Sequence, residues 1–248
     1  MMKQKGKVGK MPRDGTGASK GGSRAVNVYR ALRRAIIEQA LRPGQKLPED
    51  AIGQQFGVSR TLVREAIGRL AIEGLVDVRH NRGACVAHPS IEDARGVFEV
   101  RRGLERIVIE LLAGRLTPDQ VTALTAHVAL EESAAQDGPK SIRLAGEFHI
   151  MLADMTSNEL LLRYVQEVSS RCSLILALYG RPHSSDCAVS EHRQLIESLV
   201  SGDAKAAMLL MDHHLDAVAS RALLASKGTQ DIQDALAPYA QLEKHETA

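Results

Sequence analysis

The first third of the chain shows two helical patterns joined by a turn. Apolar residues recur at helical spacing after Ser23, which can cap a helix, and the pattern ends before Arg42-Pro43-Gly44. A short second helix opens at Pro48, and Gly57 stands where a left-handed residue commonly ends a helix. The spacing therefore predicts a long and a short helix in this region.

A third helix and a hairpin follow. Ser59 is a suitable cap for a helix from Arg60 to Glu73, whose apolar residues lie on one face. After Gly74 the apolar residues alternate with polar ones, which predicts two short strands around His80-Asn81-Arg82-Gly83. Three helices and a two-stranded wing make up a winged helix-turn-helix. A helix about 10–12 Å across fits the major groove of DNA, so we expect this part of the chain to bind DNA.

The chain from Ser90 onward contains only helical patterns, so the expected fold class is mainly α. In Thr117-Pro118-Asp119-Gln120, a capping Thr is followed by a Pro at the first helical position and a Gln three residues after the cap. Helices are expected at 91–114, 118–134, 140–156, 158–179, 186–201 and 203–226. An all-α antiparallel bundle is therefore predicted.

These patterns divide the chain into four segments. Residues 1–22 are rich in Gly and Lys and have almost nothing to bury, so we expect a disordered basic tail, which either contacts DNA phosphates or is simply solvated. The winged helix-turn-helix occupies residues 23–89 and the helical bundle residues 90–226. Residues 227–248 lose the helical spacing and are expected to fray.

Charge is distributed unevenly between the two ends. The formal net charge is +2, yet residues 1–90 hold 17 Lys and Arg against 7 Asp and Glu, whereas residues 91–248 hold 15 against 23. Neutralising phosphates is the largest sequence-independent contribution to DNA affinity. A polyanionic partner is therefore expected at the N-terminal third and not at the acidic remainder.

Composition also indicates the compartment. No segment approaches the roughly 20 continuous apolar residues of a membrane span, and the first residues lack the apolar core of a signal peptide. Cys85, Cys172 and Cys187 form no Cys-x-x-Cys pair, which argues against a disulfide framework and a thiolate zinc site. We expect a cytoplasmic protein with reduced thiols and no membrane partner.

Residues 47–86 resemble the DNA-binding domain of the GntR family of bacterial regulators. The motifs that carry this resemblance are Gly57-Val58-Ser59-Arg60-Thr61, Val63-Arg64-Glu65-Ala66, Gly74-Leu75-Val76 and Arg82-Gly83. The helical part resembles the FCD ligand-sensing domain of the FadR-like subfamily. That second resemblance rests on Arg101, Leu104-Glu105, Phe148-His149, Ser157-Asn158, Glu191-His192 and His214-Leu215. Together the two cover residues 24 to about 225.

The resemblance implies a set of DNA contacts. These are Ser59, Arg60, Thr61 and Arg64 of the third helix, with the wing residues His80, Asn81, Arg82 and Gly83 near the minor groove. An Arg can bind guanine O6 and N7 through two hydrogen bonds, and hydroxyls bind phosphates. The alternative for the two arginines is a solvated helix face. Some relatives have a DNA-contacting Arg where this chain has Asp50, so that contact is expected to be lost and the operator to differ.

Three histidines form a candidate metal site. His149 and His192 lie on the apolar faces of their helices, and the resemblance favours His214 over its neighbour His213 as the third inward imidazole. Three imidazoles from three helices can bind a divalent metal such as zinc, nickel or manganese and leave positions open for a carboxylate. Relatives with a metal usually have Asp or Asn where this chain has Ala145. The alternatives are binding by three histidines and water, weaker binding, direct contact with the ligand, or ordinary core histidines.

Two polar residues are candidates for effector binding. Arg101 lies on an apolar stripe, so its charge must find a partner inside the bundle. The resemblance makes that partner the carboxylate of an effector, and the alternative is an ion pair with Glu105. Asn158 is either a further effector contact or a helix cap.

These features together predict a transcriptional regulator and not an enzyme. The expected protein is a homodimer that binds a palindromic DNA operator, and the resemblance implies a repressor relieved by a small carboxylate metabolite. One alternative is a metal-dependent hydrolase fused to a DNA-binding domain, which would lack a suitable acid-base partner. The other is an architectural DNA-binding protein that responds to no effector.

Overall fold

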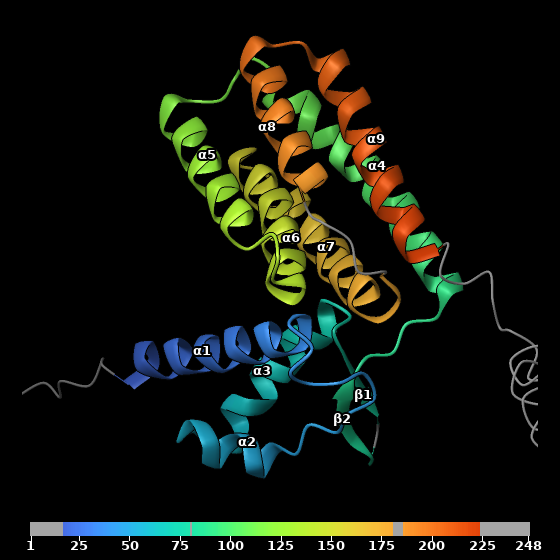
Figure 1. Ribbon diagram of the computed structural model, residues 1–248. Helices are drawn as coiled ribbons and strands as arrows, with labels where there is room; N and C mark the ends of the chain where they lie inside the picture. Colours follow the sequence, from blue (N-terminus) through green and yellow to red (C-terminus); the bar gives the residue numbers. More distant parts are fainter. Residues whose placement is uncertain (1–16, 80, 181–185, 224–248) are drawn as a thin grey trace, which may run out of the picture.

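The computed structural model describes residues 17–79, 81–180 and 186–223 (Figure 1). Within these residues, three helices and a two-stranded sheet form an N-terminal domain, and six helices form a bundle packed against it. None of the described helices has the length and apolar character needed to cross a membrane. The predicted fold class, a winged helix-turn-helix followed by an all-α bundle, is confirmed.

The N-terminal domain follows the predicted order of elements. They are α1 (Gly17–Ile37), α2 (Glu49–Phe56), α3 (Arg60–Ile72), β1 (Val76–Arg79) and β2 (Gly83–Val86). Gly57 ends α2 with a φ of 61°, a left-handed conformation that glycine adopts without steric cost. The strands pair antiparallel, with Val76 opposite Val86 and Arg79 opposite Gly83.

The start of α1 corrects the prediction. The helix begins at Gly17, inside the segment expected to be a tail, and not at Ser23. The tail was expected because residues 1–22 are rich in Gly and Lys with almost nothing to bury, and each glycine costs about 1 kcal/mol in a helix interior. Extending an existing helix costs far less free energy than nucleating one, so the helix formed by residues 24–37 can extend back to Gly17. The rest of the predicted tail, residues 1–16, lies outside the described residues.

The core of the N-terminal domain joins α1, α3 and the sheet. Val28, Leu32 and Ile36 of α1 belong to one buried cluster with Val63 and Leu70 of α3. Leu174, from a helix of the bundle, belongs to the same cluster. The DNA-binding domain therefore shares its core with the bundle.

The bundle helices lie close to their predicted ranges. They are α4 (Ile91–Leu112), α5 (Pro118–Ser133), α6 (Gly138–Met155), α7 (Glu159–Tyr179), α8 (Asp186–Ser201) and α9 (Ala204–Leu223). Reciprocal capping boxes begin α4 at Ser90 and Asp93, and α5 at Thr117 and Gln120. The expected end of the last helix at 226 and the expected frayed tail lie outside the described residues.

Packing in the bundle buries an aliphatic core around one aromatic ring. Phe148 and Leu152 of α6, Leu195 and Leu199 of α8, and Met211 of α9 belong to this cluster. Helix α4 contacts both α7 and α9, while α5 contacts α6 and α8 (Figure 1). The polar residues described below lie inside this apolar frame.

Polar contacts tie the two domains together. Arg33 of α1 donates to the Ser170 hydroxyl of α7 at 2.9 Å and to Glu73 at 3.1 Å. Arg143 of α6 donates to the carboxylate of Glu38, the residue that follows α1, at 2.7 Å. Helices α6 and α7 therefore contact the N-terminal domain directly through polar side chains.

Candidate DNA-binding surface and effector site

The first turns of α3 present the predicted DNA-contacting residues to solvent. Ser59, Arg60, Thr61 and Arg64 are all exposed. Ser59 occupies the N-cap position with an extended backbone, but its side chain makes no capping hydrogen bond. The structure therefore brings these four residues together at one exposed end of a helix, as a major-groove reading helix requires.

Carboxylates of α2 lie beside the two arginines. Arg60 is bonded to Asp50, and Arg64 Nε lies 2.7 Å from Glu49 Oε2. The arginine side chains remain 62% and 66% exposed, so these are surface ion pairs of small energetic weight. Asp50 thus does more than remove a DNA contact, because it also binds an arginine of the reading helix.

The wing carries the second group of predicted contacts. Asn81, Arg82 and Gly83 are exposed, and Asn81 and Gly83 have φ values of 58° and 78°. The Arg82 amide donates to the Arg79 carbonyl at 3.1 Å and closes the turn. His80 lies outside the described residues.

The three predicted histidines converge in the bundle. His149, His192 and His214 come from α6, α8 and α9, and one nitrogen of each lies within 4.8 Å of the others. Their side chains are buried, and the Nε2 atoms of His149 and His214 are 3.3 Å apart. His213 instead points outward, with its side chain 77% exposed. The choice of His214 over His213 agrees with this geometry.

Each imidazole has a carboxylate behind it. His192 Nδ1 lies 2.7 Å from Glu131 and His214 Nδ1 lies 2.7 Å from Glu191. His149 Nδ1 lies 2.9 Å from Glu105 Oε1 but, unlike the other two, makes no hydrogen bond to a described residue. A carboxylate that accepts from Nδ1–H leaves Nε2 unprotonated and able to bind a metal, which is the usual outer-shell arrangement of metal-binding histidines.

Two further observations fit a metal at this position. His192 Nε2 is fully buried and has no hydrogen-bond partner among the described residues. Burial lowers the pKa of His149 and of His214 well below the usual value, which keeps both imidazoles in the neutral form that binds metals. The donor set of three imidazoles suits zinc or a similar divalent ion. Ala145 supplies no fourth ligand and leaves open the position that an acidic residue would take.

A cavity of about 370 Å³ opens beside the histidines. Arg101, His149 and His214 line it together with Ala145, and Arg101 Nε lies 3.3 Å from Glu105 Oε1. Arg101 therefore forms the ion pair with Glu105 and also lines the cavity, and its contact with an effector stays a prediction. The described residues that line the cavity include two arginines and two histidines but no Asp or Glu. This cavity is therefore electrostatically suited to an anion.

Asn158 does not belong to this cavity. Its side chain accepts a hydrogen bond from the Leu161 amide at 3.1 Å and caps α7. The residue is exposed and is not among those that line the cavity. The helix-cap interpretation of Asn158 is the one that the geometry supports.

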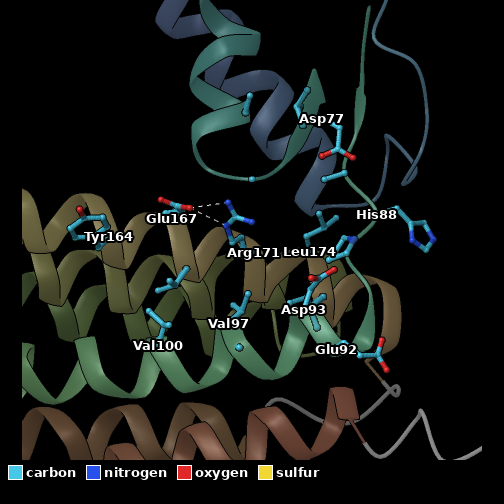
Figure 2. Close-up of a pocket in the computed structure, with 18 of the residues that line it drawn as sticks. Asp77, His88, Glu92, Asp93, Val97, Val100, Tyr164, Glu167, Arg171 and Leu174 are labelled. Carbon is cyan, nitrogen blue, oxygen red and sulfur yellow. Dashed lines mark hydrogen bonds and ion pairs between the residues drawn. The ribbon is translucent and has the colours of Figure 1, made fainter. Parts of the chain in front are cut away.

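Figure 2 shows a larger cavity of about 1000 Å³ between the DNA-binding domain and the helices α4 and α7. Asp77, Glu92, Asp93 and Glu167 line it, and Arg171 is bonded to Glu167 at 2.8 Å. These carboxylates make it a poor site for an anion. The smaller cavity beside the histidines is electrostatically better suited to an anion.

Sequence patterns missed several residues of the site. Glu131 follows His127 by four residues on the buried face of α5, so a buried acid at helical spacing was an available signal. Gln39, in the segment after α1, lines the effector cavity, and no local pattern could have indicated this. Its contact depends on how the two domains pack.

Comparison with known proteins supports this division of the chain. Residues 24–86 match the bacterial regulatory proteins of the gntR family, and residues 96–217 match the FCD domain. The Uxu operon transcriptional regulator of Escherichia coli K12 is 30% identical over 224 residues, which cover 81% of this chain and 87% of the relative. The chain belongs to the GntR family.

Other GntR-family members share the same architecture. The Uxu operon regulator of Haemophilus influenzae is 28% identical over 213 residues, covering 78% of this chain and 79% of the relative. A solved GntR regulator from Rhodococcus sp. RHA1 superposes with a TM-score of 0.70 at 24% identity, covering 83% of this chain and all of the other. This GntR-family protein is therefore a DNA-binding transcriptional regulator and not an enzyme, and the hydrolase alternative is rejected.

Proposed function

We propose that this regulator is a homodimeric repressor that releases a palindromic operator, in the cytoplasm, when a small carboxylate binds in its helical domain. The observation that carries the proposal is the cavity of about 370 Å³, which Arg101, His149 and His214 line and to which no described residue contributes a carboxylate. A 25% identical relative from Escherichia coli K12 is named as the transcriptional repressor RspR, which favours repression here.

A divalent metal completes the proposed site. His149, His192 and His214 would hold it through their Nε2 atoms. Glu131 and Glu191 orient the imidazoles of His192 and His214 through their Nδ1 atoms, and Glu105 lies beside Nδ1 of His149. When bound, the metal supplies open coordination positions that a carboxylate can occupy. Arg101 faces the same space and neutralises the carboxylate through charge-assisted hydrogen bonds.

The proposed effector lies where it can influence the DNA-binding domain. Gln39, which follows α1, lines the cavity together with Ser173 and Leu176 of α7. Helix α7 also contacts the DNA-binding domain through Ser170 and Leu174. An effector that binds one arrangement of α1 and α7 more tightly than another shifts the protein toward it, by as much as the two affinities differ.

The proposed dimer contact is an apolar strip on α4 and α7, which we name the α4–α7 face. It consists of Val100, Leu104, Ile107, Leu160 and Tyr164. The two helices pack side by side, and Val100 and Tyr164 line one open surface (Figure 2). Leu104 lines the same surface. Four of the five are exposed large apolar side chains, a feature that commonly marks a contact with another chain. A palindromic operator calls for a second copy of the same protein as the occupant.

DNA binding is tested by selecting an operator from random oligonucleotides and measuring affinity by fluorescence anisotropy. We expect Arg60→Ala and Arg64→Ala each to weaken binding by about tenfold or more, because each removes a base or phosphate contact. Arg95→Ala removes an equally exposed arginine from α4 and serves as the matched control. Equal losses in all three variants would contradict the assignment of α3 as the reading helix.

The effector response is tested by adding small carboxylates to the same anisotropy assay. At least one is expected to lower operator affinity, and Arg101→Met is expected to lose that response. Unchanged affinity with every carboxylate would favour the architectural alternative.

Elemental analysis of the purified protein tests the metal. We expect about one zinc, nickel or manganese ion per chain. His192→Ala should lose the ion, while His213→Ala, which changes an exposed imidazole next to a proposed ligand, should retain it. Protein that is reproducibly metal-free without exposure to chelators would reject the metal and leave Arg101 and the imidazoles as a direct anion site.

A further inference from the structure

A second arginine lines the effector cavity. Arg221 lies on α9 seven residues after His214, with Val218 between them, and all three line the same space. Positions separated by four and seven residues share one face of a helix. Seven residues span about 10 Å of helix axis, and the side chain of Arg221 leans back toward the N-terminus of α9, where His214 lies.

The two arginines of the cavity differ in how their charge is balanced. Arg101 is paired with the buried Glu105. Arg221 forms no hydrogen bond or ion pair with any part of the chain that the structure describes. Glu191 of α8 attracts Arg221 electrostatically, but its carboxylate is already held by His214 at 2.7 Å and lies 3.5 Å from His213. Among the described residues, Arg221 is therefore the arginine of the cavity that has no directly bonded anionic partner.

Partial burial makes that imbalance significant. Burial lowers the pKa of Arg221, although Glu191 opposes the effect, which means that its guanidinium has lost part of its hydration. Arginine nonetheless stays protonated at any pH at which the protein is folded. A partly desolvated cation on the wall of a ligand-sized cavity gains most from an anionic group that the ligand brings.

We propose that the effector is a dianion whose second anionic group binds Arg221, while its first carboxylate binds near Arg101 and the histidines. This inference rests on the proposed function, since it assigns the chemical class of the effector for the same cavity. A linear dicarboxylate such as glutarate or adipate, or a sugar diacid, has a charge at each end and an uncharged middle. The middle would lie against the uncharged wall formed by Ala145, Leu176 and Val218.

Isothermal titration calorimetry with matched probes tests the proposal. Glutarate and adipate are each compared with their monoamides, glutaramate and adipamate, which keep the length and lose one charge. Wild-type protein is expected to bind the better dicarboxylate about tenfold to a hundredfold more tightly than its monoamide, as a charge-assisted contact implies. Arg221→Met should abolish this ratio and leave the monoamide affinity unchanged, whereas Arg221→Lys should retain most of it.

Lys205→Met supplies the control, since it removes an exposed positive charge from the same helix outside the cavity and should keep the wild-type ratio. Circular dichroism shows whether the variants fold. If Arg221→Met does not fold, the ratio of dicarboxylate to monoamide affinity in wild-type protein still tests the proposal. Equal binding of dicarboxylates and monoamides would overturn the role of Arg221 and leave the proposed carboxylate site standing. Binding of neither probe would overturn both.

Discussion

Asp50 occupies the first turn of α2, and its carboxylate is bonded to Arg60 of the reading helix. This places a negative charge next to the surface that approaches DNA phosphates. The same residue is bonded to one of the arginines that we propose to contact DNA. Asp50 is therefore expected both to lack the DNA contact of some relatives and to weaken the contact that we propose for Arg60.

Replacement of Asp50 by Asn is expected to strengthen operator binding. The change frees Arg60 and removes a charge that repels phosphates, and the gain should be up to about fivefold because exposed ion pairs are weak. Fluorescence anisotropy with the selected operator measures it. Asp119→Asn on α5 removes the same charge far from α3 and should have little effect. A weaker complex with Asp50→Asn would mean that the carboxylate itself reads the operator.

The buried histidines predict a pH dependence of stability. Burial lowers the pKa of His149 and of His214, so below about pH 6.5 the unfolded chain binds more protons than the folded chain. Above that pH, these two imidazoles should not change the free energy of unfolding of the metal-free protein. It should fall as the pH is lowered further, by up to about 1.4 kcal/mol per pH unit for each imidazole. Urea denaturation at a series of pH values measures this.

A double variant isolates the imidazole contribution. His149→Gln with His214→Gln should flatten the dependence, while His213→Gln should leave it unchanged. Glu105 opposes this trend. Burial raises the pKa of its carboxyl, so the folded chain takes up this proton more readily than the unfolded chain and gains stability from it as the pH falls. An equally steep pH dependence in the double variant would show that other groups cause it.

Helix α7 is the element that both domains share. Leu174 contributes to the core of the DNA-binding domain, while Ser173 and Leu176 line the effector cavity. Gly74, in the turn after α3, has a φ of 69° and lies against the Arg171 guanidinium of α7. The turn can approach the helix this closely because glycine has no Cβ.

Gly74→Ala is expected to lower the free energy of unfolding by about 1–2 kcal/mol, the cost of a left-handed conformation for alanine. An added Cβ would also lie 2.2 Å from Arg171 Cζ and displace that side chain. Gly68→Ala inside α3 is the matched control. It has no neighbour within 4 Å and should raise stability by about 0.5–1 kcal/mol. Equal effects in urea denaturation would contradict a special role for Gly74.

The proposed dimer depends on the α4–α7 face, a surface to which two helices of the bundle contribute. Ile107→Glu on the α4–α7 face is expected to convert a dimer to a monomer in sedimentation experiments, because it buries a charge in an apolar contact. Operator affinity should fall with it, since a monomer occupies only one half-site. Leu130→Glu on α5 changes an equally exposed apolar residue away from this face. If only Leu130→Glu produced monomers, the dimer contact would lie elsewhere.

Local interactions explain why the sequence predicted the elements so closely. Capping residues such as Ser90 and Thr117 act within one turn, and apolar spacing identifies the buried face of each helix from neighbouring positions. The inward positions of His149, His192 and His214 follow from the same spacing and from the family motifs. The start of α1 was missed because glycine propensity is a weak local signal that an existing helix overrides.

Contacts between distant parts of the chain required the folded structure. Glu131 is 61 residues from His192, and Gln39 reaches the effector cavity from the segment after α1. Asn158 matched a motif, yet its position at the start of α7 keeps it out of that cavity. Helical periodicity states which face of a helix is buried, but not which neighbour it meets. The neighbour depends on how nine described helices pack, and that packing decides which charges share a cavity.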